Sequence, residues 1–484
     1  MQLYKAIKNH IASKLLPVVM VLLLCGMNVR AVKLKGTVSC NGKGIANVEI
    51  TDGNTCTLTD NKGRYRLISE HARFVYISTP AGYLAPRKKS LPVFYKQIEN
   101  GVKRYDFALE KNSKDDTHHL FLVQADVQLI DTACLRQYNA MIPDCVDLIR
   151  QNRDLDVFGV DCGDIVGDTH GLYSGYLKAA DRMDVPVFRA IGNHDMDYFG
   201  RSHETSTHTF EDWFGPTRFS FNKGKAHYIV IDNNFFIGRD YFYMGYVDEK
   251  TFHWLEQDLS YVQKGSTVFL IMHIPTRLNE QKQQFAYTYS NVADQTVNYP
   301  VLYDMLKPFK THIIDGHMHY NLTMVQSPTM IEHNTGAVCG TWWLTDICLD
   351  GTPRGYGVYE VNGDSVSWYY KSAGYPKSYQ MRVYPAGSVT VYPNDIIANV
   401  WNWDSAWKVE WSENGVIQGE MNRFTGSDPD AAAFCSDKKR VKYDWISVFS
   451  TDHLFRATPH DKNARIEVKV TDRFGNVYRQ NLNH

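Results

Sequence analysis

Residues 185–195 read VPVFRAIGNHD, an apolar run that ends directly in Gly192-Asn193-His194-Asp195. The run is short and apolar enough for a buried β-strand, and glycine lets the backbone turn sharply where the polar residues begin. An amide, an imidazole and a carboxylate together are side chains that bind divalent cations. This stretch therefore predicts an α/β protein with a ligand-binding loop at the end of a strand.

The same arrangement recurs along the central part of the sequence, where apolar segments at 119–125, 157–160, 266–272 and 312–314 each precede polar residues. Strand ends in α/β sheets are where ligand-binding loops gather, so these pieces can converge. Two carboxylates, an amide and three imidazoles suit a pair of divalent cations, and Gln128 could join them. The pieces are Asp126-Val127-Gln128, Gly163-Asp164, Met272-His273-Ile274-Pro275 and Gly316-His317-Met318-His319.

Helical patterns separate these strands. Residues 131–152 can be largely helical, with Pro143 interrupting the helix, and a second helical stretch lies near 248–264. A further strand is expected at 226–231. Alternating strands and helices predict an α/β body over residues 118–339.

The regions on either side of the α/β body have a different hydrophobic pattern, in which apolar and polar residues alternate. Residues 32–110 contain short runs that alternate apolar and polar side chains, which predicts a β domain, and the polar stretch 111–117 predicts a linker. Beyond residue 340 the alternation returns, for example at Val409 and Trp411. Residues 340–484 are therefore expected to form a C-terminal all-β domain.

Residues 1–31 have the pattern of a signal peptide. Four basic residues and no acidic residue surround an apolar run at 15–27, which is too short to cross a bilayer comfortably. A signal anchor and a lipoprotein attached at Cys25 remain alternatives. The sequence thus predicts an exported protein, either periplasmic or at the cell surface or secreted, with no transmembrane span in the mature chain.

Composition excludes other classes of protein. Among 484 residues, 52 Lys and Arg stand against 53 Asp and Glu, so the chain lacks the basic field of a typical nucleic-acid-binding protein. Hydrophobic residues at 44% and charged residues at 22% argue against wholesale disorder and against a polytopic membrane protein. Nucleic acid is therefore not an expected partner, and the oligomeric state is left open.

Nine cysteines in 484 residues do not make a dense disulfide framework. In an exported β domain, Cys40 and Cys56 could pair. Cys162, between Asp161 and Gly163, is expected to be a free thiol in a buried strand. No cysteine spacing resembles a zinc site.

The order of the central motifs resembles that of the calcineurin-like metallophosphoesterase superfamily, whose motifs run Asp-x-His, Gly-Asp, Gly-Asn-His-Asp/Glu, a lone His and Gly-His-x-His. The segments 44–50 and 59–65 resemble the carboxypeptidase-regulatory-like, transthyretin-like sandwich of exported bacterial proteins. Residues 340–343 and 350–356 add to the likeness. The resemblance implies two mixed β-sheets face to face, flanked by helices, with an N-terminal β-sandwich and a C-terminal all-β domain.

The resemblance also implies roles for particular residues. A hydroxide that bridges two metals would be the nucleophile, with Asp164 bridging the same metals and His194 acting as general acid toward the leaving group. One metal would be held by Asp126, Gln128, Asp164 and His319, and the other by Asp164, Asn193, His273 and His317.

Two positions depart from the family pattern. Gln128 stands where many members have histidine, and the weaker amide ligand favours manganese or iron over zinc, although an ordinary surface glutamine is the alternative. The position three residues after Asp164, which in some members carries the aspartate that orients the acid, is Gly167. Either Asp168 or Asp195 is expected to serve instead.

The expected activity is hydrolysis of a small phosphate monoester or diester by a metal-dependent enzyme. One alternative is a phosphodiesterase specific for nucleotides or glycerophosphodiesters. Another is a cell-surface binding protein with an inactive phosphoesterase body, in which the β domains contact a glycan or a protein. Trp342 and Trp343 are interpreted as packing between the central body and the last domain, with a substrate platform as the alternative.

Overall fold

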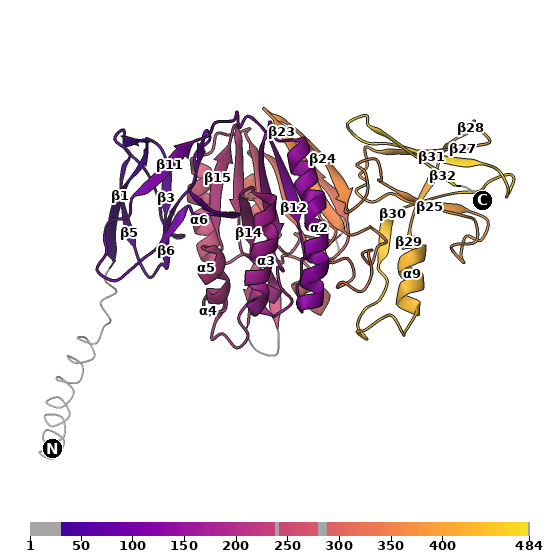
Figure 1. The fold of residues 1–484 in the computed structure, drawn as a ribbon, viewed down its shortest axis with the longest axis horizontal. Helices are drawn as coiled ribbons and strands as arrows, with labels where there is room; N and C mark the ends of the chain where they lie inside the picture. The colour runs from indigo at the N-terminus through magenta and orange to yellow at the C-terminus, as the bar shows by residue number, and fades with distance from the viewer. Residues whose placement is uncertain (1–30, 238–241, 279–287, 483–484) are drawn as a thin grey trace, which may run out of the picture.

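The computed structural model describes residues 31–237, 242–278 and 288–482. Figure 1 shows a β-rich N-terminal part, a central body of strands and helices, and a β-rich C-terminal part following one another along the long axis. The predicted signal peptide lies outside the described residues except for residue 31. Within the described ranges, no helix has the length and apolar character needed to cross a membrane.

A five-stranded mixed sheet forms one layer of the central body. Its three parallel strands run β14-β13-β12, and β23 pairs antiparallel with β12 and then with β24. Every residue of β13 and β14 is buried, as expected for parallel strands covered on both faces. The strands are β12 (His118–Gln124), β13 (Asp156–Cys162), β14 (Val187–Ala190), β23 (Gly355–Asn362) and β24 (Ser365–Ser372).

A six-stranded mixed sheet forms the second layer, in the order β15-β16-β19-β20-β22-β21. Its four central strands are parallel, and the edge strands β15 and β21 are antiparallel to their neighbours. The strands are β15 (Phe219–Lys223), β16 (Ala226–Val230), β19 (Thr267–Ile271), β20 (Lys310–Asp315), β21 (Leu322–Ser327) and β22 (Met330–Asn334).

Aromatic rings fill the space between the two sheets. Phe121 of β12 stacks on Phe158 of β13 and meets Phe269 of β19 edge to face, with ring centroids 5.1 and 5.2 Å apart. Such pairs add about 0.5–1.5 kcal/mol to the burial of their area. The same core continues into the N-terminal part, where the Phe94 ring lies 4.6 Å from Phe219.

Helices cover the outer faces of both sheets. Two of them, α2 (Thr132–Gln151) and α3 (Tyr173–Ala180), pack on the five-stranded sheet, and α6 (Glu249–Ser260) and α8 (Tyr299–Leu306) pack on the six-stranded sheet. Shorter elements are α4 (His203–Ser206), α5 (His208–Phe214), β17 (Asn234–Phe236), β18 (Tyr243–Gly245), α7 (Tyr289–Ala293) and the 3₁₀ turns His170–Leu172, Asp181–Met183 and Asn193–Asp195. The prediction of helix-flanked mixed sheets agrees with this arrangement.

Pro143 does not interrupt α2, contrary to the sequence prediction. A proline inside a helix leaves the carbonyl four residues earlier without its usual donor. Here the Arg182 guanidinium donates to that carbonyl, of Asn139, at 3.1 Å. A tertiary contact therefore compensates for the missing backbone hydrogen bond.

The N-terminal strands form two sheets. The first contains β2 (Lys43–Gly44), β1 (Val32–Cys40), β11 (Phe107–Lys111) and β7 (Tyr83–Leu84), with β5 (Arg64–Ser69) paired to β1. The second contains β10 (Tyr95–Gln97), β6 (Phe74–Ile77), β3 (Glu49–Thr51) and β4 (Cys56–Leu58), and a small hairpin joins β8 (Arg87–Lys88) to β9 (Leu91–Pro92).

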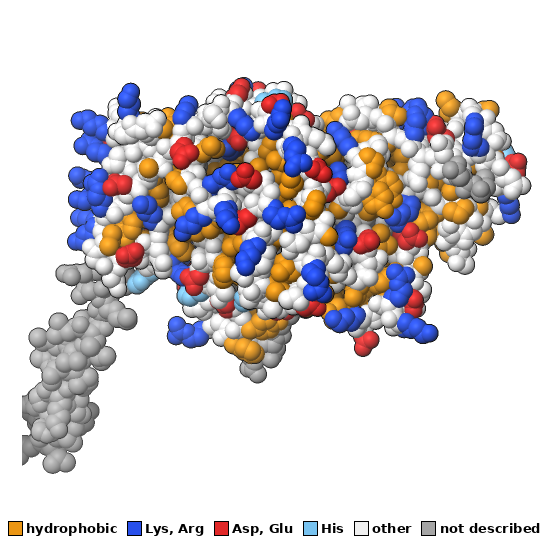
Figure 2. Space-filling view, viewed as in Figure 1, with side chains coloured by type: hydrophobic (Ala, Val, Ile, Leu, Met, Phe, Trp, Pro, Cys, Tyr) orange, Lys and Arg blue, Asp and Glu red, His pale blue; other side chains and the backbone are white. Residues whose placement is uncertain are grey.

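Charge is unevenly distributed over these strands. Along β1 and β5 buried residues alternate with exposed Lys33, Lys35, Arg64 and Arg66. Figure 2 shows Lys and Arg side chains gathered at this end of the molecule, whereas charges of both signs mix over the central body.

The C-terminal strands also form two sheets. One has the order β25-β26-β30-β29 and the other β28-β27-β31-β32, with α9 (Pro429–Ser436) between β29 and β30 in sequence. The strands are β25 (Arg382–Tyr384), β26 (Ile396–Asn399), β27 (Lys408–Glu413), β28 (Val416–Glu420), β29 (Asn422–Ser427), β30 (Ser450–Ala457), β31 (Ile466–Thr471) and β32 (Val477–Leu482).

The central sheet extends past residue 339, where the sequence analysis placed the end of the central body. Both β23 and β24 lie beyond that residue, yet β23 pairs with β12 over six residues from His118↔Asn362 to Val123↔Gly357. Alternation of side chains is common to every half-exposed strand, so it could not show which sheet these two strands join.

The eight described cysteines are all free thiols. The suggested pairing of Cys40 with Cys56 is therefore wrong for this structure. Cys162 is a fully buried free thiol, as predicted.

Two histidines are buried between the central sheets. Nδ1 of His312 lies 3.0 Å from Nε2 of His333, and both rings contact the Trp368 indole. Burial lowers the pKa of His312 to about 3 and also lowers the pKa of His333. Both rings are therefore neutral at pH 7 in the folded protein.

Acid should destabilise the fold through this pair. Unfolded histidine protonates near pH 6.5 whereas the buried rings do not, so the unfolded state binds more protons as pH falls below about 7. Between pH 7 and pH 5 each ring should remove up to about 2 kcal/mol from the free energy of unfolding. Urea titrations of metal-free protein at both pH values measure this, and a His312→Asn/His333→Asn variant should lose less on acidification. An equal loss in both proteins would contradict the assignment.

Candidate metal centre

The predicted metal ligands lie on loops that follow five central strands. Five of these residues have a left-handed backbone although none is glycine, a conformation that costs of order 1–3 kcal/mol each. Strain of this kind persists only where surrounding structure enforces it, and it is characteristic of functional sites. The residues and their φ angles are Asp126 53°, Gln128 40°, Asp164 52°, His317 69° and His319 56°.

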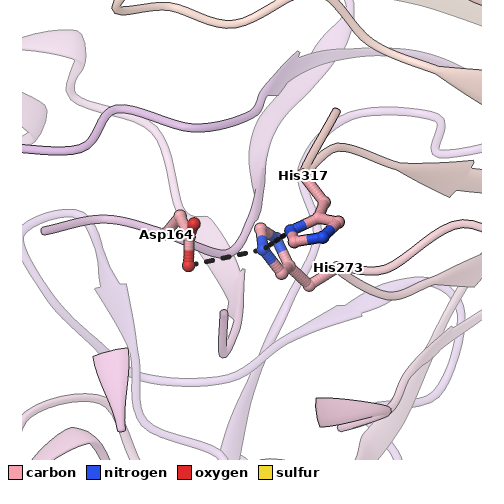
Figure 3. Close-up of side chains that lie close together, drawn as sticks. All are labelled: Asp164, His273 and His317. Atoms are coloured by element: carbon pink, nitrogen blue, oxygen red, sulfur yellow. Dashed lines mark hydrogen bonds and ion pairs between the residues drawn. The ribbon is translucent and has the colours of Figure 1, made fainter. Parts of the chain in front are cut away.

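Three of the predicted metal ligands, Asp164, His273 and His317, form a compact cluster (Figure 3). Nε2 of His273 lies 3.3 Å from Oδ1 of Asp164 and 3.2 Å from Nδ1 of His317. One ligand atom from each residue falls within 4.8 Å of the others, which is a spacing that could hold a metal ion. The Asp164 and His273 side chains are almost entirely buried, at 1% and 0% exposure.

A hydrogen bond to the backbone, on the ring nitrogen that faces away from Asp164, sets the orientation of His273. Its Nδ1 lies 2.7 Å from the Cys162 carbonyl oxygen and donates to it, so Nε2 carries the lone pair when the ring is neutral. That nitrogen faces Oδ1 of Asn193 at 3.0 Å and the Asp164 carboxylate. Three electron-rich atoms facing one another are stable only when a proton or a cation lies among them.

Electrostatics within the cluster agree with this geometry. Burial alone would lower the pKa of His273, but the Asp164 carboxylate outweighs it and raises the pKa to about 9. Burial would raise the pKa of Asp164, but the charges of His273 and His194 outweigh it and lower the pKa. The cluster therefore favours positive charge next to Asp164, and a divalent cation would displace the imidazole proton.

His317 has an outer partner that sequence reasoning missed. Its Nε2 lies 3.8 Å from Oδ1 of Asp294, and its Nδ1 faces His273. A carboxylate behind a histidine orients the ring and favours the proton on the outer nitrogen. No motif surrounds Asp294, so only the fold could bring it to this position.

A second group of predicted ligands lies on the other side of Asp164. Nε2 of His319 is 3.5 Å from Oδ1 of Asp126, and Nε2 of Gln128 donates to Oδ2 of Asp164 at 2.9 Å. The Asp126 carboxylate also accepts the His317 amide at 2.9 Å. The Asp164 carboxylate thus contacts a residue of each group, Gln128 through Oδ2 and His273 through Oδ1.

The surroundings of the Gln128 side chain show whether this second group of residues suits a cation. Its side chain is buried, and among the described residues Oε1 has no hydrogen-bond partner. Buried polar atoms are almost always hydrogen-bonded, so this orphan oxygen, on a side chain that contacts the Asp164 carboxylate, is a ligand atom in need of a donor or a cation. The residues present therefore fit divalent cations. Gln128 is not the surface residue that the alternative interpretation allowed.

His194 lies at the rim of the site with 24% of its side chain exposed. Its Nδ1 is 2.9 Å from Oδ1 of Asp168, and its backbone amide donates to Asp164 at 2.8 Å. Burial lowers the pKa of His194, but Asp164 and Asp168 outweigh it and raise the pKa above its ordinary value. Tyr198 hydrogen-bonds Asp168 in turn, a contact that sequence reasoning did not identify.

Of the two candidates for the partner of His194, the structure brings Asp168 to the imidazole and turns Asp195 away. The Asp195 carboxylate accepts the amides of Ile165 and Gly192 and the Tyr173 hydroxyl. Burial raises the pKa of Asp195 to about 7. Its contacts join the loops that carry Asp164 and Asn193, so Asp195 positions the site.

Comparison with known families identifies both flanks. Residues 32–112 match a sequence model described as the N terminal of calcineurin-like phosphoesterase, and residues 332–478 match one described as the C terminal of calcineurin-like phosphoesterase. No curated protein matches the chain. With the clustered ligands between them, the two matches support the calcineurin-like phosphoesterase superfamily and a metal-dependent phosphoesterase.

Solved structures resemble the chain at low identity. A dimetal phosphatase from Danio rerio is 14% identical, with 53% of this chain and 96% of that one covered and a TM-score of 0.38. The purple acid phosphatase PPD1 of yellow lupin (Lupinus luteus) is 12% identical, with 68% and 67% covered and a TM-score of 0.36. GAP50, the anchor in the inner membrane complex of Plasmodium, is 14% identical, with 53% and 85% covered and a TM-score of 0.36.

Replacing Asp164 with asparagine should remove metal from the protein. Asn keeps the shape of the side chain but loses the charge that both groups of ligands share, so metal affinity should fall by at least about 100-fold. Elemental analysis after equilibrium dialysis against Mn²⁺ measures the effect. Asp346→Asn, at a side chain that is 81% exposed, is the matched control and should retain metal. Unchanged metal content in Asp164→Asn would contradict the assignment.

Proposed function

We propose that this protein is a dinuclear-metal phosphoesterase that hydrolyses small phosphate monoesters or diesters. The observation that carries the proposal is the convergence of five loops on Asp164, which has ligand-type side chains on both sides and a histidine–aspartate pair at the rim. The family matches on both flanks support the same conclusion.

Divalent cations, when bound, polarise the phosphoryl oxygens and lower the pKa of bound water toward neutrality. Asp126, Gln128, Asp164 and His319 would hold one cation, and Asp164, Asn193, His273 and His317 the other. The weak amide ligand at Gln128 favours manganese or iron over zinc at the first position. Because these residues are buried, a cation that they hold would attract the charge on the phosphoryl group more strongly than it would in water.

The chain's own contribution to bond cleavage is a proton held on His194. Asp168 holds the Nδ1 hydrogen, which leaves Nε2 as the nitrogen that can give a proton to the leaving oxygen. The raised pKa of His194 favours the protonated imidazole that a general acid needs. Its partial exposure lets the substrate reach it, unlike the fully buried His273.

Metal content and ester hydrolysis together test the proposal. Purified protein loaded with Mn²⁺, Fe²⁺ or Zn²⁺ should bind close to two ions per chain and hydrolyse p-nitrophenyl phosphate or bis-p-nitrophenyl phosphate. The preferred ester decides between a monoesterase and a diesterase. Absence of metal under every loading condition would overturn the proposal and favour the binding-protein alternative.

His194→Ala should slow the reaction without removing metal. The loss in kcat should be about 10²–10⁴-fold for a substrate with a high-pKa leaving group and much smaller for p-nitrophenolate, which needs no proton. Comparing alkyl and p-nitrophenyl phosphates, with elemental analysis of each sample, separates the two effects. Asp168→Asn should show the same dependence on the leaving group at smaller magnitude. Metal loss in His194→Ala would show that the acid role is wrong.

A further inference from the structure

The metal centre borders a set of aromatic rings that the proposed chemistry does not use. The Trp342 ring stacks on the His319 imidazole with centroids 4.2 Å apart and planes at 24°. Its neighbour Trp343 is buried and donates its indole hydrogen to the Val127 carbonyl at 2.9 Å. Both tryptophans have left-handed backbones, with φ of 47° and 63°. Trp343 thus anchors a strained turn that presents Trp342 to the site.

Trp445 continues this surface outward. The Trp445 ring meets Trp342 nearly at right angles, with centroids 4.5 Å apart, and lies almost parallel to Tyr443 at 5.3 Å. Trp445 is 59% exposed, whereas the next residue, Ile446, is buried in a small apolar cluster. The backbone at this point is therefore anchored while the indole faces solvent.

The segment that carries Trp445 comes from the C-terminal part of the chain, between α9 and β30. Figure 1 shows both of these elements in the β-rich C-terminal part. The Trp445 ring contacts Trp342, which stacks on His319, so this segment lies on the side of the site that holds His319.

Burial does not account for the position of Trp445. A tryptophan that served only to pack the two parts together would be expected to hide most of its large apolar surface. Tyrosine and tryptophan with one end anchored and a face open are typical of surfaces that bind planar groups by stacking. We define Trp342, Tyr443 and Trp445 as the aromatic wall.

We propose that the aromatic wall binds a planar aromatic ring in the organic part of the phosphate ester. This inference rests on the proposed function, because it assigns the substrate class of the same site. The wall begins at the ring of His319, so a phosphoryl group at the metal centre and an aromatic ring on the wall can belong to one small molecule. A nucleobase and a simple aryl group share this chemistry.

Matched substrate pairs test the proposal on the metal-loaded full-length protein. Adenosine 5′-monophosphate and ribose 5-phosphate contain the same type of phosphate ester with and without a base. Benzyl phosphate and cyclohexylmethyl phosphate compare a planar with a non-planar ring on leaving alcohols of similar pKa. The wild-type protein should prefer the aromatic member of one pair by about 10-fold or more in kcat/KM, and the pair that shows the preference identifies the source of the ring.

Trp445→Ala should abolish that preference by raising KM for the aromatic substrate about 10-fold, with kcat and the rate on the non-aromatic partner nearly unchanged. Trp445→Phe should restore most of the preference, because a smaller ring still stacks. Ile417→Ala, at a side chain that is 76% exposed on β28, is a matched surface control and should behave like the wild type.

The outcomes separate this inference from the proposed function. Equal use of both members of each pair by the wild-type protein would overturn the aromatic wall and leave the phosphoesterase intact. If none of the substrates is hydrolysed, calorimetric titration of the Mn²⁺-loaded protein decides. Adenosine 5′-monophosphate or benzyl phosphate should then bind at least about 10-fold more tightly than its non-aromatic partner, and only when Trp445 is present. Equal binding within both pairs would overturn the inference.

Discussion

A buried carboxylate, Asp164, is the residue on which the rest of the site depends. It contacts His273 on one side and Gln128 on the other, and the His194 amide donates to it as well. Uncompensated charge in a protein interior is expensive, so the loops around it must supply positive charge or hold a cation. The histidines, the amides and the strained turns are all arranged around that requirement.

Two layers of sheet make this arrangement possible. Loops from the five-stranded sheet carry Asp126, Asp164 and Asn193, and loops from the six-stranded sheet carry His273 and His317. Because aromatic rings lock the sheets together, strand ends from both layers are held at fixed positions. A rigid frame of this kind can stabilise several left-handed, non-glycine residues at once.

The chain beyond residue 340 contributes both to the central body and to the surroundings of the metal centre. It completes the central sheet through β23 and places a segment with an exposed tryptophan beside the metal centre. The Asp350 carboxylate accepts the Asn321 amide at 3.0 Å, just after His319, and lies 3.1 Å from Nε2 of His453 on β30. The loop that carries His317 and His319 is therefore also held in place by residues from the C-terminal part of the chain.

The sequence alone determined the alternation of strands and helices in the central body and the set of ligand-type residues, because burial on both faces and short polar motifs leave local patterns. Only the tertiary structure decided that Asp168 meets His194, that Asp294 lies behind His317 and that β23 joins the central sheet. These contacts join residues with no shared local pattern. Their partners are chosen by how the sheets pack, and packing is a property of the whole chain.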